Sequence, residues 1–239
     1  MENSKPIALD AYEELAERYS QHAEQKAENG YIEHPAMRKQ LGVIKGLNIL
    51  EAGCGPGFLT KYLYDHGAER VISFDVSTKM IELAKARIGK KAQCYVADMA
   101  KPLSFIHERE FDLVVSSLAI DYVYDWSVPL SEFYRSLKNG GRLVISIQHP
   151  LGSYNWYKPK SDFGVQLVEA YWRGFGGKPV RVPDYYRSFS EVINPLLKAG
   201  FQLKEIVEAK PIAELKEYQP DRYKKYEHMA TFMVIEAQK

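Results

Sequence analysis

The sequence has little cysteine, no long apolar stretch and almost no net charge, and each shortage excludes a class of protein. Its two cysteines, Cys54 and Cys94, are too few for a disulfide scaffold and lack the Cys/His spacing of a zinc site. No apolar run reaches the 18 residues that a membrane span needs. Because 32 Lys and Arg face 31 Asp and Glu, no overall field attracts nucleic acid or anionic lipid. We therefore expect reduced thiols, no metal and no membrane contact.

The first ten residues, MENSKPIALD, lack the basic and apolar regions of a signal peptide, which predicts a cytoplasmic protein. The hydrophobic fraction of 46% and the charged fraction of 26% are those of a globular chain. A length of 239 residues favours a single domain.

Strand-like and helix-like patterns alternate along the chain. Strands are expected at 47–52, 70–75, 93–97, 111–117 and 142–148, with helices at 57–66, 78–88 and 127–138. One helix is expected from Asp10 to Gly30, and a late helix at 189–199 precedes strands at 201–210 and 228–236. This alternation predicts an α/β fold with a doubly wound, parallel sheet.

The segment LNILEAGCGPGFLTKYL carries a buried strand directly into Gly53, Gly55 and Gly57 and then into a helix pattern. Ligands of open parallel sheets bind outside the carboxyl ends of the strands. Glycine there permits positive φ and close approach of a ligand, and the following helix N-terminus can hold an anion. A nucleotide-like ligand fits this place. The dinucleotide fingerprint fails, because Phe58 stands where the third glycine of G-x-G-x-x-G belongs.

The spacing E-x-G-x-G-x-G from Glu51 resembles the first motif of class I S-adenosylmethionine-dependent methyltransferases, and four later segments resemble that family in order. They are VISFDVSTKM, CYVADMAKPL, FDLVVSSLAIDYVYDW and LKNGGRLVISIQHP. The likeness covers residues 40–150 in motif and is strongest to the branch that methylates quinones and similar small metabolites. It implies a Rossmann-like seven-stranded sheet, mostly parallel with one antiparallel strand and helices on both faces. The implied cofactor is S-adenosylmethionine, with S-adenosylhomocysteine as product.

The resemblance also implies a cofactor site at the strand ends. Asp75 would accept hydrogen bonds from both ribose hydroxyls, and Asp98 with Met99 would hold the adenine. Glu51, where many relatives have Asp, would reach the methionine amine, and the Tyr19 ring would shield the sulfonium. The implied set is Tyr19, Glu51, Gly53, Cys54, Gly55, Asp75, Val76, Met80, Asp98, Met99 and Ser116. The alternatives stay open: Gly53 and Gly55 as turn glycines without a ligand, Asp75 and Asp98 as capping residues, and Ser116 as a plain strand end. For Met80, Met99 and Tyr19 the alternative is packing.

Three residues are candidate general bases for an acceptor that carries a proton to lose: His149, Asp121 and His34. His149 is the best placed, because it follows the fifth strand and precedes Pro150 at the crevice mouth. A structural, hydrogen-bonded histidine is the alternative.

The segment 150–187 is the most aromatic part of the chain and corresponds to the insertion that covers the acceptor in similar methyltransferases. Its predicted substrate contacts are Tyr154, Trp156, Tyr171, Trp172, Tyr186 and Arg187. The same composition would suit an RNA platform or a dimer surface, although a net charge of +1 argues against RNA. We expect methyl transfer to a small aromatic or apolar metabolite. An RNA or protein acceptor, or a non-catalytic binding protein, are the alternatives.

These expectations combine into one methyltransferase domain over residues 1–239. Its parts are a helical cap (8–42), a nucleotide-binding core (43–149), a lid (150–187) and a final helix with a strand pair (188–239). Either a monomer or a homodimer is expected.

Overall fold

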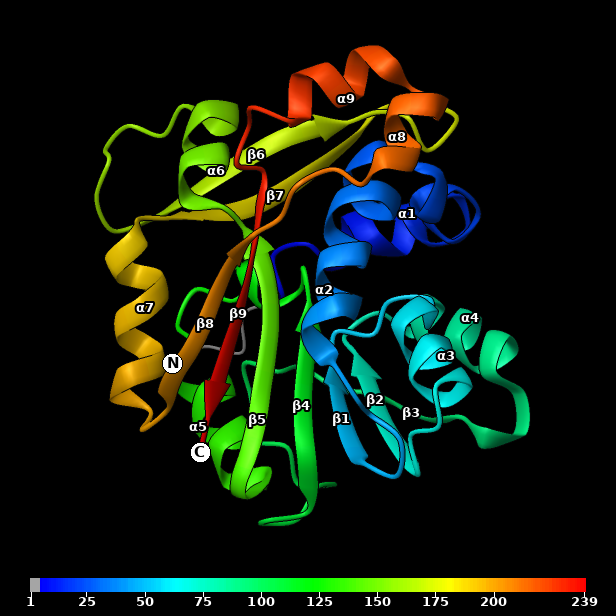
Figure 1. Ribbon diagram of the computed structural model, residues 1–239, viewed down its shortest axis with the longest axis vertical. Helices are drawn as coiled ribbons and strands as arrows, with labels where there is room; N and C mark the ends of the chain where they lie inside the picture. Colours follow the sequence, from blue (N-terminus) through cyan, green and yellow to red (C-terminus); the bar gives the residue numbers. More distant parts are fainter. Residues whose placement is uncertain (1–4) are drawn as a thin grey trace.

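The computed structural model describes residues 5–239, and its centre is a seven-stranded sheet in the order β3-β2-β1-β4-β5-β9-β8 (Figure 1). Strands β1 to β5 run parallel, and β9 lies antiparallel between β5 and β8. The Rossmann-like sheet with one antiparallel strand is therefore confirmed. The strands of this sheet are β1 Asn48–Ala52, β2 Arg70–Asp75, β3 Gln93–Val96, β4 Phe111–Ser117, β5 Leu137–Gln148, β8 Gln202–Glu208 and β9 Phe232–Gln238.

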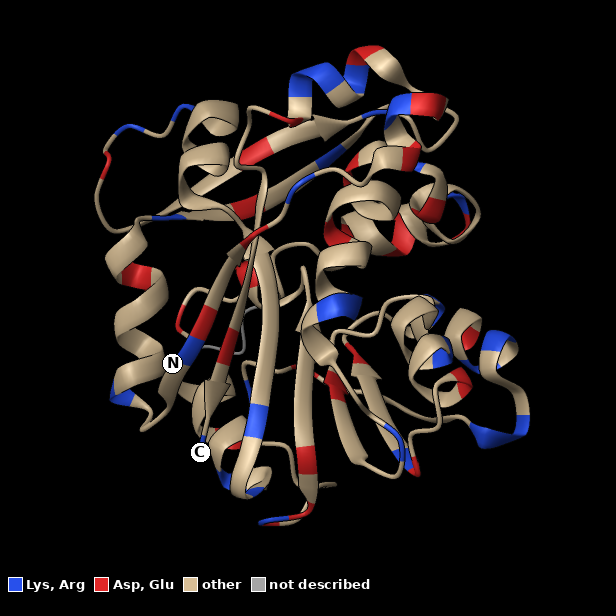
Figure 2. Ribbon diagram, viewed as in Figure 1, with Lys and Arg blue, Asp and Glu red and all other residues tan. Residues whose placement is uncertain are grey.

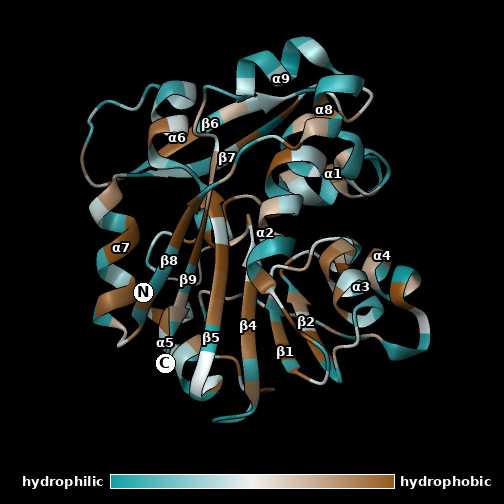
Figure 3. Ribbon diagram, in the orientation of Figure 1, coloured by the Kyte–Doolittle hydropathy of each residue, from teal (hydrophilic) through white to brown (hydrophobic). Residues whose placement is uncertain are grey.

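Apolar side chains that alternate along the strands form two cores, one on each face of the sheet. Ile49, Val71 and Val115 face one way, toward α2 (His34–Leu41) and α3 (Phe58–Asp65). Leu50 and Ile72 face the other way, toward α5 (Ser127–Ser136) and α7 (Phe189–Lys198). Figure 3 shows the apolar strands between helices of mixed hydropathy. Burial on both faces explains why the strands read as continuous apolar runs.

The remaining elements gather at the carboxyl edge of the parallel strands (Figure 1). A separate antiparallel hairpin, β6 with β7, lies there beside α1, α6, α8 and α9. Their bounds are α1 Leu9–His22, α6 Pro150–Tyr157, β6 Val165–Trp172, β7 Val180–Arg187, α8 Ala213–Tyr218 and α9 Pro220–Tyr226. The helix α4, Thr78–Ile88, packs on β2 and β3 of the main sheet. The short helical turns are η1 Ala23–Gln25, η2 Asn29–Glu33, η3 Gly89–Lys91 and η4 Ile120–Tyr122. The ends of the parallel strands are thus covered by segments from both halves of the chain.

The predicted single helix from Asp10 to Gly30 is wrong in its second half. The helix ends at His22, and the chain continues through η1 into the π-helical turn η2. A Cβ at Gly30 would lie 1.9 Å from the carbonyl oxygen of Glu24, so this glycine permits a close chain crossing. Two regions for which the sequence pattern gives no helix or strand contain regular structure: the aromatic segment holds α6 and the hairpin, and the connection before β9 holds the helices α8 and α9.

The Lys and Arg positions are interspersed with the Asp and Glu positions along the ribbon of the helices and strands in Figure 2. Within residues 5–239, no helix is long and apolar enough to cross a membrane. The same residues contain no cluster of three or more His, Cys, Asp or Glu side chains that could hold a metal ion.

Candidate active site

The main cavity of the structure has a volume of about 500 Å³ and lies at the carboxyl ends of β1 to β4. Its floor is formed by the loops that follow these strands, and its cover by the segment 5–9 with Tyr12 and Tyr19 of α1. Eight of the predicted cofactor residues line it: Tyr19, Gly53, Gly55, Asp75, Val76, Met80, Asp98 and Met99.

The glycines of the first loop have left-handed backbones that bring the main chain to the cavity. Gly53 has φ +74°, and a Cβ there would lie 2.2 Å from the Cβ of Ala119 and 3.3 Å from Cε of Met99. Gly55 has φ +51° and open space where its Cβ would stand. Only glycine combines this backbone with this close approach. The loop therefore offers bare backbone to a ligand.

Asp75 ends β2 with a fixed carboxylate. Its Oδ2 accepts a hydrogen bond from the Gly55 N–H at 2.9 Å, and its Oδ1 accepts one from the Ser77 N–H at 2.9 Å. Burial raises the pKa of this carboxyl, and the two backbone donors lower it. Each oxygen keeps a second lone pair, so the group can still accept hydrogen bonds from two hydroxyls of a ligand.

Asp98 and Met99 follow β3 on the same floor. The Asp98 Oδ1 accepts a hydrogen bond from the Ala100 N–H at 2.9 Å, which holds the loop in a turn. Met99 is nearly buried and packs beside Gly53. Asp98 can therefore stabilise this turn and still contact a ligand, because it also lines the cavity.

An aromatic cluster closes the cavity. The Tyr12 hydroxyl donates to the Tyr122 hydroxyl at 2.7 Å, and the Tyr12 ring meets those of Tyr19, Tyr122 and Trp172 edge-on at 5.3–6.1 Å. Tyr19 also stacks on Phe175 at 5.2 Å. Burial raises the pKa of Tyr12 and of Tyr122 well above the usual value, so both hydroxyls stay protonated at neutral pH. The hairpin is tied to α1 by these rings.

Three predicted cofactor residues do not line this cavity. The Glu51 carboxylate lies between the sheet and α3, where Oε2 accepts hydrogen bonds from the hydroxyls of Thr60 and Ser73, and burial raises its pKa to about 7. Cys54 packs against α4. Ser116 is fully buried, on the face of β4 opposite to that of Ser117. Their contact with a cofactor stays a prediction that these positions do not favour.

Comparison with known proteins gives the same picture. Residues 50–145 match the family model described as a methyltransferase domain. A crystal structure from Listeria monocytogenes, assigned to the S-adenosylmethionine-dependent methyltransferases, superposes with TM-score 0.73 at 25% identity over 87% of this chain and 96% of that one. The protein is an S-adenosylmethionine-dependent methyltransferase.

Two curated relatives extend this comparison. An uncharacterised protein of Haemophilus influenzae is 28% identical over 227 residues, 88% of each chain. A malonyl-[acyl-carrier protein] O-methyltransferase of Enterobacter lignolyticus is 36% identical over 144 residues, 59% of this chain and 53% of the relative. The methyltransferase thus spans about half the length of that second relative.

The candidate bases of the methyltransferase lie outside the main cavity. His149 is nearly buried at the N-terminus of α6, where Nδ1 accepts a hydrogen bond from the Leu151 N–H at 3.1 Å and Nε2 pairs with Glu208 at 3.2 Å. Asp121 accepts a hydrogen bond from the Gln148 N–H at 2.9 Å, and burial with the nearby Asp184 raises its pKa to about 8. His34 lies near the start of α3 beside Phe58. The hydrogen bonds give His149 and Asp121 structural roles, and a part in catalysis stays a prediction.

None of the six predicted substrate contacts lines the main cavity. Trp156 of α6 and Tyr171 of β6 are 63% and 61% exposed. Tyr186 is buried and donates to the Asp162 carbonyl, Tyr154 packs edge-on against it, and Trp172 packs on Tyr12. Arg187 is buried over the Trp126 ring and donates to the carbonyl oxygens of Val123 and Tyr124.

Other residues take their place. Ser117, Tyr122, Tyr124 and Tyr185 line the main cavity, although the sequence analysis did not select them. Ser117 and Tyr185 are each one position from a predicted residue. Since side chains of a strand alternate between faces, the predicted residues and those that line the cavity differ by one step of strand phase, which the sequence alone did not resolve.

Proposed function

We propose that this methyltransferase transfers the methyl group of S-adenosylmethionine to a small aromatic or apolar metabolite. The observation that carries the proposal is the composition of one cavity, which joins the strand-end aspartates and glycines to the rings of Tyr12, Tyr122, Tyr124 and Tyr185. Large rings with a few polar groups are typical of small-molecule pockets. The quinone-methylating branch of the family stays a prediction within this class.

The cofactor assignment follows the cavity floor. Asp75 would hold the ribose hydroxyls, and Asp98 with Met99 the adenine. The bare backbone at Gly53 and Gly55 would lie against the methionine part. S-adenosylmethionine supplies an electrophilic methyl group on a positively charged sulfur. Tyr12 and Tyr19 would exclude water from it and present aromatic faces to the charge.

The main contribution of the protein to the reaction is to position the acceptor, and acid–base catalysis is secondary. Methyl transfer needs the acceptor atom in line with the methyl group at about 3–3.5 Å, and a pocket that holds it there supplies a large part of the rate. Tyr122, Tyr124 and Tyr185 are the residues placed to do so. General-base roles for His149 and Asp121 stay predictions, since neither side chain lines the cavity.

The test is to incubate the purified protein with methyl-labelled S-adenosylmethionine and a cytosolic extract, then separate labelled small molecules, RNA and protein. Label in the small-molecule fraction supports the proposal and gives a mass for the acceptor. Label in RNA or in protein would replace it with a macromolecular acceptor. No labelled fraction beyond that of a heat-inactivated control would favour a binding protein with this fold.

Variants then connect the activity to the cavity. Tyr185→Ala should raise KM for the acceptor about 10-fold or more, since a ring that packs against a bound ligand contributes about 1–3 kcal/mol. The affinity for S-adenosylhomocysteine should stay unchanged. Tyr171→Ala removes an exposed ring from the same hairpin and is the matched control. Equal effects of the two substitutions would contradict the acceptor site.

A further inference from the structure

A buried carboxylate stands beside the main cavity without a full set of partners. Glu33 is 0% exposed and lies in the π-helical turn η2, a rare geometry often found at functional sites. Its Oε1 accepts hydrogen bonds from the hydroxyls of Ser117, at 2.8 Å, and Ser146. Its Oε2 is buried and accepts no hydrogen bond from the residues that the structure describes. One oxygen of the buried carboxylate therefore lacks a hydrogen-bond donor among the described residues.

The neighbouring cations do not neutralise Glu33. The His34 Nε2 lies 3.6 Å from Oε2, but burial lowers the pKa of His34, so the ring is mostly neutral at neutral pH. The His34 Nδ1 is also buried without a hydrogen bond from the described residues. Arg38 is directed to Glu24, at 3.2 Å. A cationic ligand group would offset the cost of leaving a buried carboxylate in this condition.

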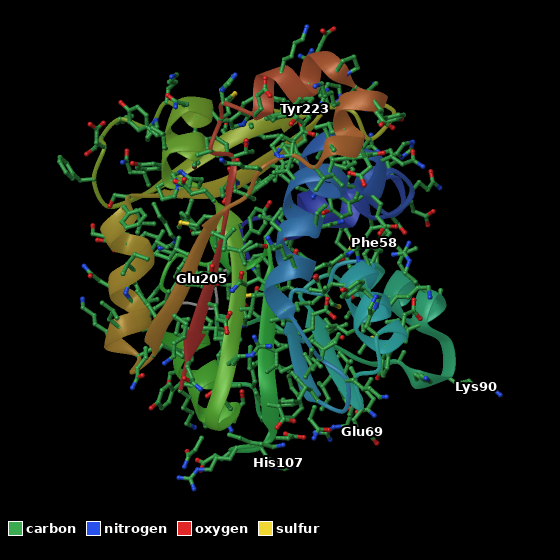
Figure 4. All side chains as sticks on the ribbon, in the orientation of Figure 1. Phe58, Glu69, Lys90, His107, Glu205 and Tyr223 are labelled. Atoms are coloured by element: carbon green, nitrogen blue, oxygen red, sulfur yellow. The ribbon has the colours of Figure 1, made fainter. Side chains whose placement is uncertain are left out.

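A second, small cavity marks where such a group would enter. It is lined by Glu33, His34, Met37, Arg38, Phe58, Leu59 and Ser117, and its volume is about 10 Å³, against about 500 Å³ for the main cavity. This is room for one group of the size of a water molecule or an ammonium. Phe58, labelled in Figure 4, begins α3 directly after the glycine loop.

Ser117 is shared by the two cavities. It lines both, and its hydroxyl is bonded to Glu33. Burial raises the pKa of the Tyr19 hydroxyl in the main cavity, and the nearby Glu33 charge raises it further. Glu33 therefore lies next to the end of β4, where Ser117 lines both cavities. The end of β4 also meets the cavity floor, because Ala119 packs directly against Gly53.

We propose that Glu33, with Ser117 and His34, is the subsite for the α-ammonium group of S-adenosylmethionine and S-adenosylhomocysteine. Its carboxylate takes the role predicted for Glu51, whose side chain is bonded to Thr60 of α3 and Ser73 of β2 instead. The inference rests on the cofactor placement proposed above, with the methionine part against the glycine loop.

The test is to titrate Glu33→Gln and the unaltered protein with three ligands by calorimetry. S-adenosylhomocysteine carries the ammonium but no sulfonium, S-adenosylmethionine carries both, and 5′-methylthioadenosine carries neither. The substitution should weaken the binding of S-adenosylhomocysteine and of S-adenosylmethionine equally, by about 10- to 100-fold, which corresponds to one hydrogen bond to a charged group. Binding of 5′-methylthioadenosine should be unchanged. A loss of affinity for S-adenosylmethionine alone would place Glu33 at the sulfonium and overturn the proposal. An equal loss of affinity for all three ligands would overturn it as well.

The matched control is Glu28→Gln. Glu28 also has a buried Oε2 without a hydrogen bond, but its Oε1 is paired with Arg222 at 2.8 Å, and it lines neither cavity. The Glu28→Gln substitution should lower stability and leave the affinities for all three ligands unchanged.

The Asp75→Asn substitution should weaken the binding of all three ligands together. Unchanged affinities in Asp75→Asn would show that the cofactor placement itself is wrong.

Should Glu33→Gln not fold, the unaltered protein still decides the matter. The deamino analogue of S-adenosylhomocysteine lacks only the ammonium group. It should bind about 10- to 100-fold more weakly than S-adenosylhomocysteine. Equal affinity of the two ligands would overturn the proposal without any variant.

Discussion

Gly53→Ala is the sharpest perturbation of the cavity floor. The added Cβ would stand 2.2 Å from the Cβ of Ala119, and the backbone would keep φ at +74°. Carbon atoms normally approach to about 3.5–4.0 Å, so Ala119 or the loop must move. Overpacking costs about 1–3 kcal/mol and a left-handed non-glycine residue about 1–2 kcal/mol. We expect a total loss of about 2–5 kcal/mol in the free energy of unfolding.

The two contributions can be separated by two further variants. Ala119→Gly removes the atom that Gly53→Ala would strike, so the double variant should recover the overpacking contribution of about 1–3 kcal/mol. Gly46→Ala is the control for backbone strain alone, because Gly46 has φ +79° and no atom within 4 Å of the Cβ position.

The assay is urea denaturation of all four variants, with titration of S-adenosylhomocysteine alongside. Because Ala119 and Met99 both line the cavity, Gly53→Ala should also weaken that ligand, and the double variant should restore part of the affinity. Two results would refute the reasoning: equal destabilisation by Gly53→Ala and Gly46→Ala, or strictly additive effects of the Gly53 and Ala119 substitutions.

Three further outcomes are expected. Asp75→Asn should weaken S-adenosylhomocysteine by about 10- to 100-fold in calorimetry, because the amide accepts one fewer hydrogen bond from the ribose, and wild-type affinity would contradict the assignment. Asp121 has its pKa raised to about 8, so the folded protein retains a proton that the unfolded chain loses above about pH 4, and stability should fall as pH rises between these values. Asp121→Asn should flatten that slope by up to about 1.4 kcal/mol per pH unit in urea denaturation at pH 5, 6 and 7, whereas parallel curves would count against it. His149→Ala removes the side chain that caps α6 at the Leu151 N–H and should cost about 0.5–2 kcal/mol of stability with S-adenosylhomocysteine affinity unchanged; a stable variant with slower turnover would restore His149 to the reaction.

Local order along the chain was enough to predict the sheet and half of the site. A strand that runs into Gly53 and Gly55, and aspartates placed at the ends of the next two strands, are patterns of neighbouring residues. In a parallel sheet the carboxyl ends share one edge, so Asp75 and Asp98 had to meet the glycine loop. These residues line the cavity as a consequence of topology alone.

Only the tertiary structure decided which side chains complete the cavity. Ser117 faces it while Ser116 is buried, and Tyr185 faces it while Tyr186 is bonded to Asp162, because a one-residue change of phase moves a side chain to the other face of a strand. Glu33 is brought to the end of β4 by a π-helical turn that no periodicity signals. Contacts between segments more than 80 positions apart depend on how the whole chain packs, and the sequence of either segment alone does not contain them.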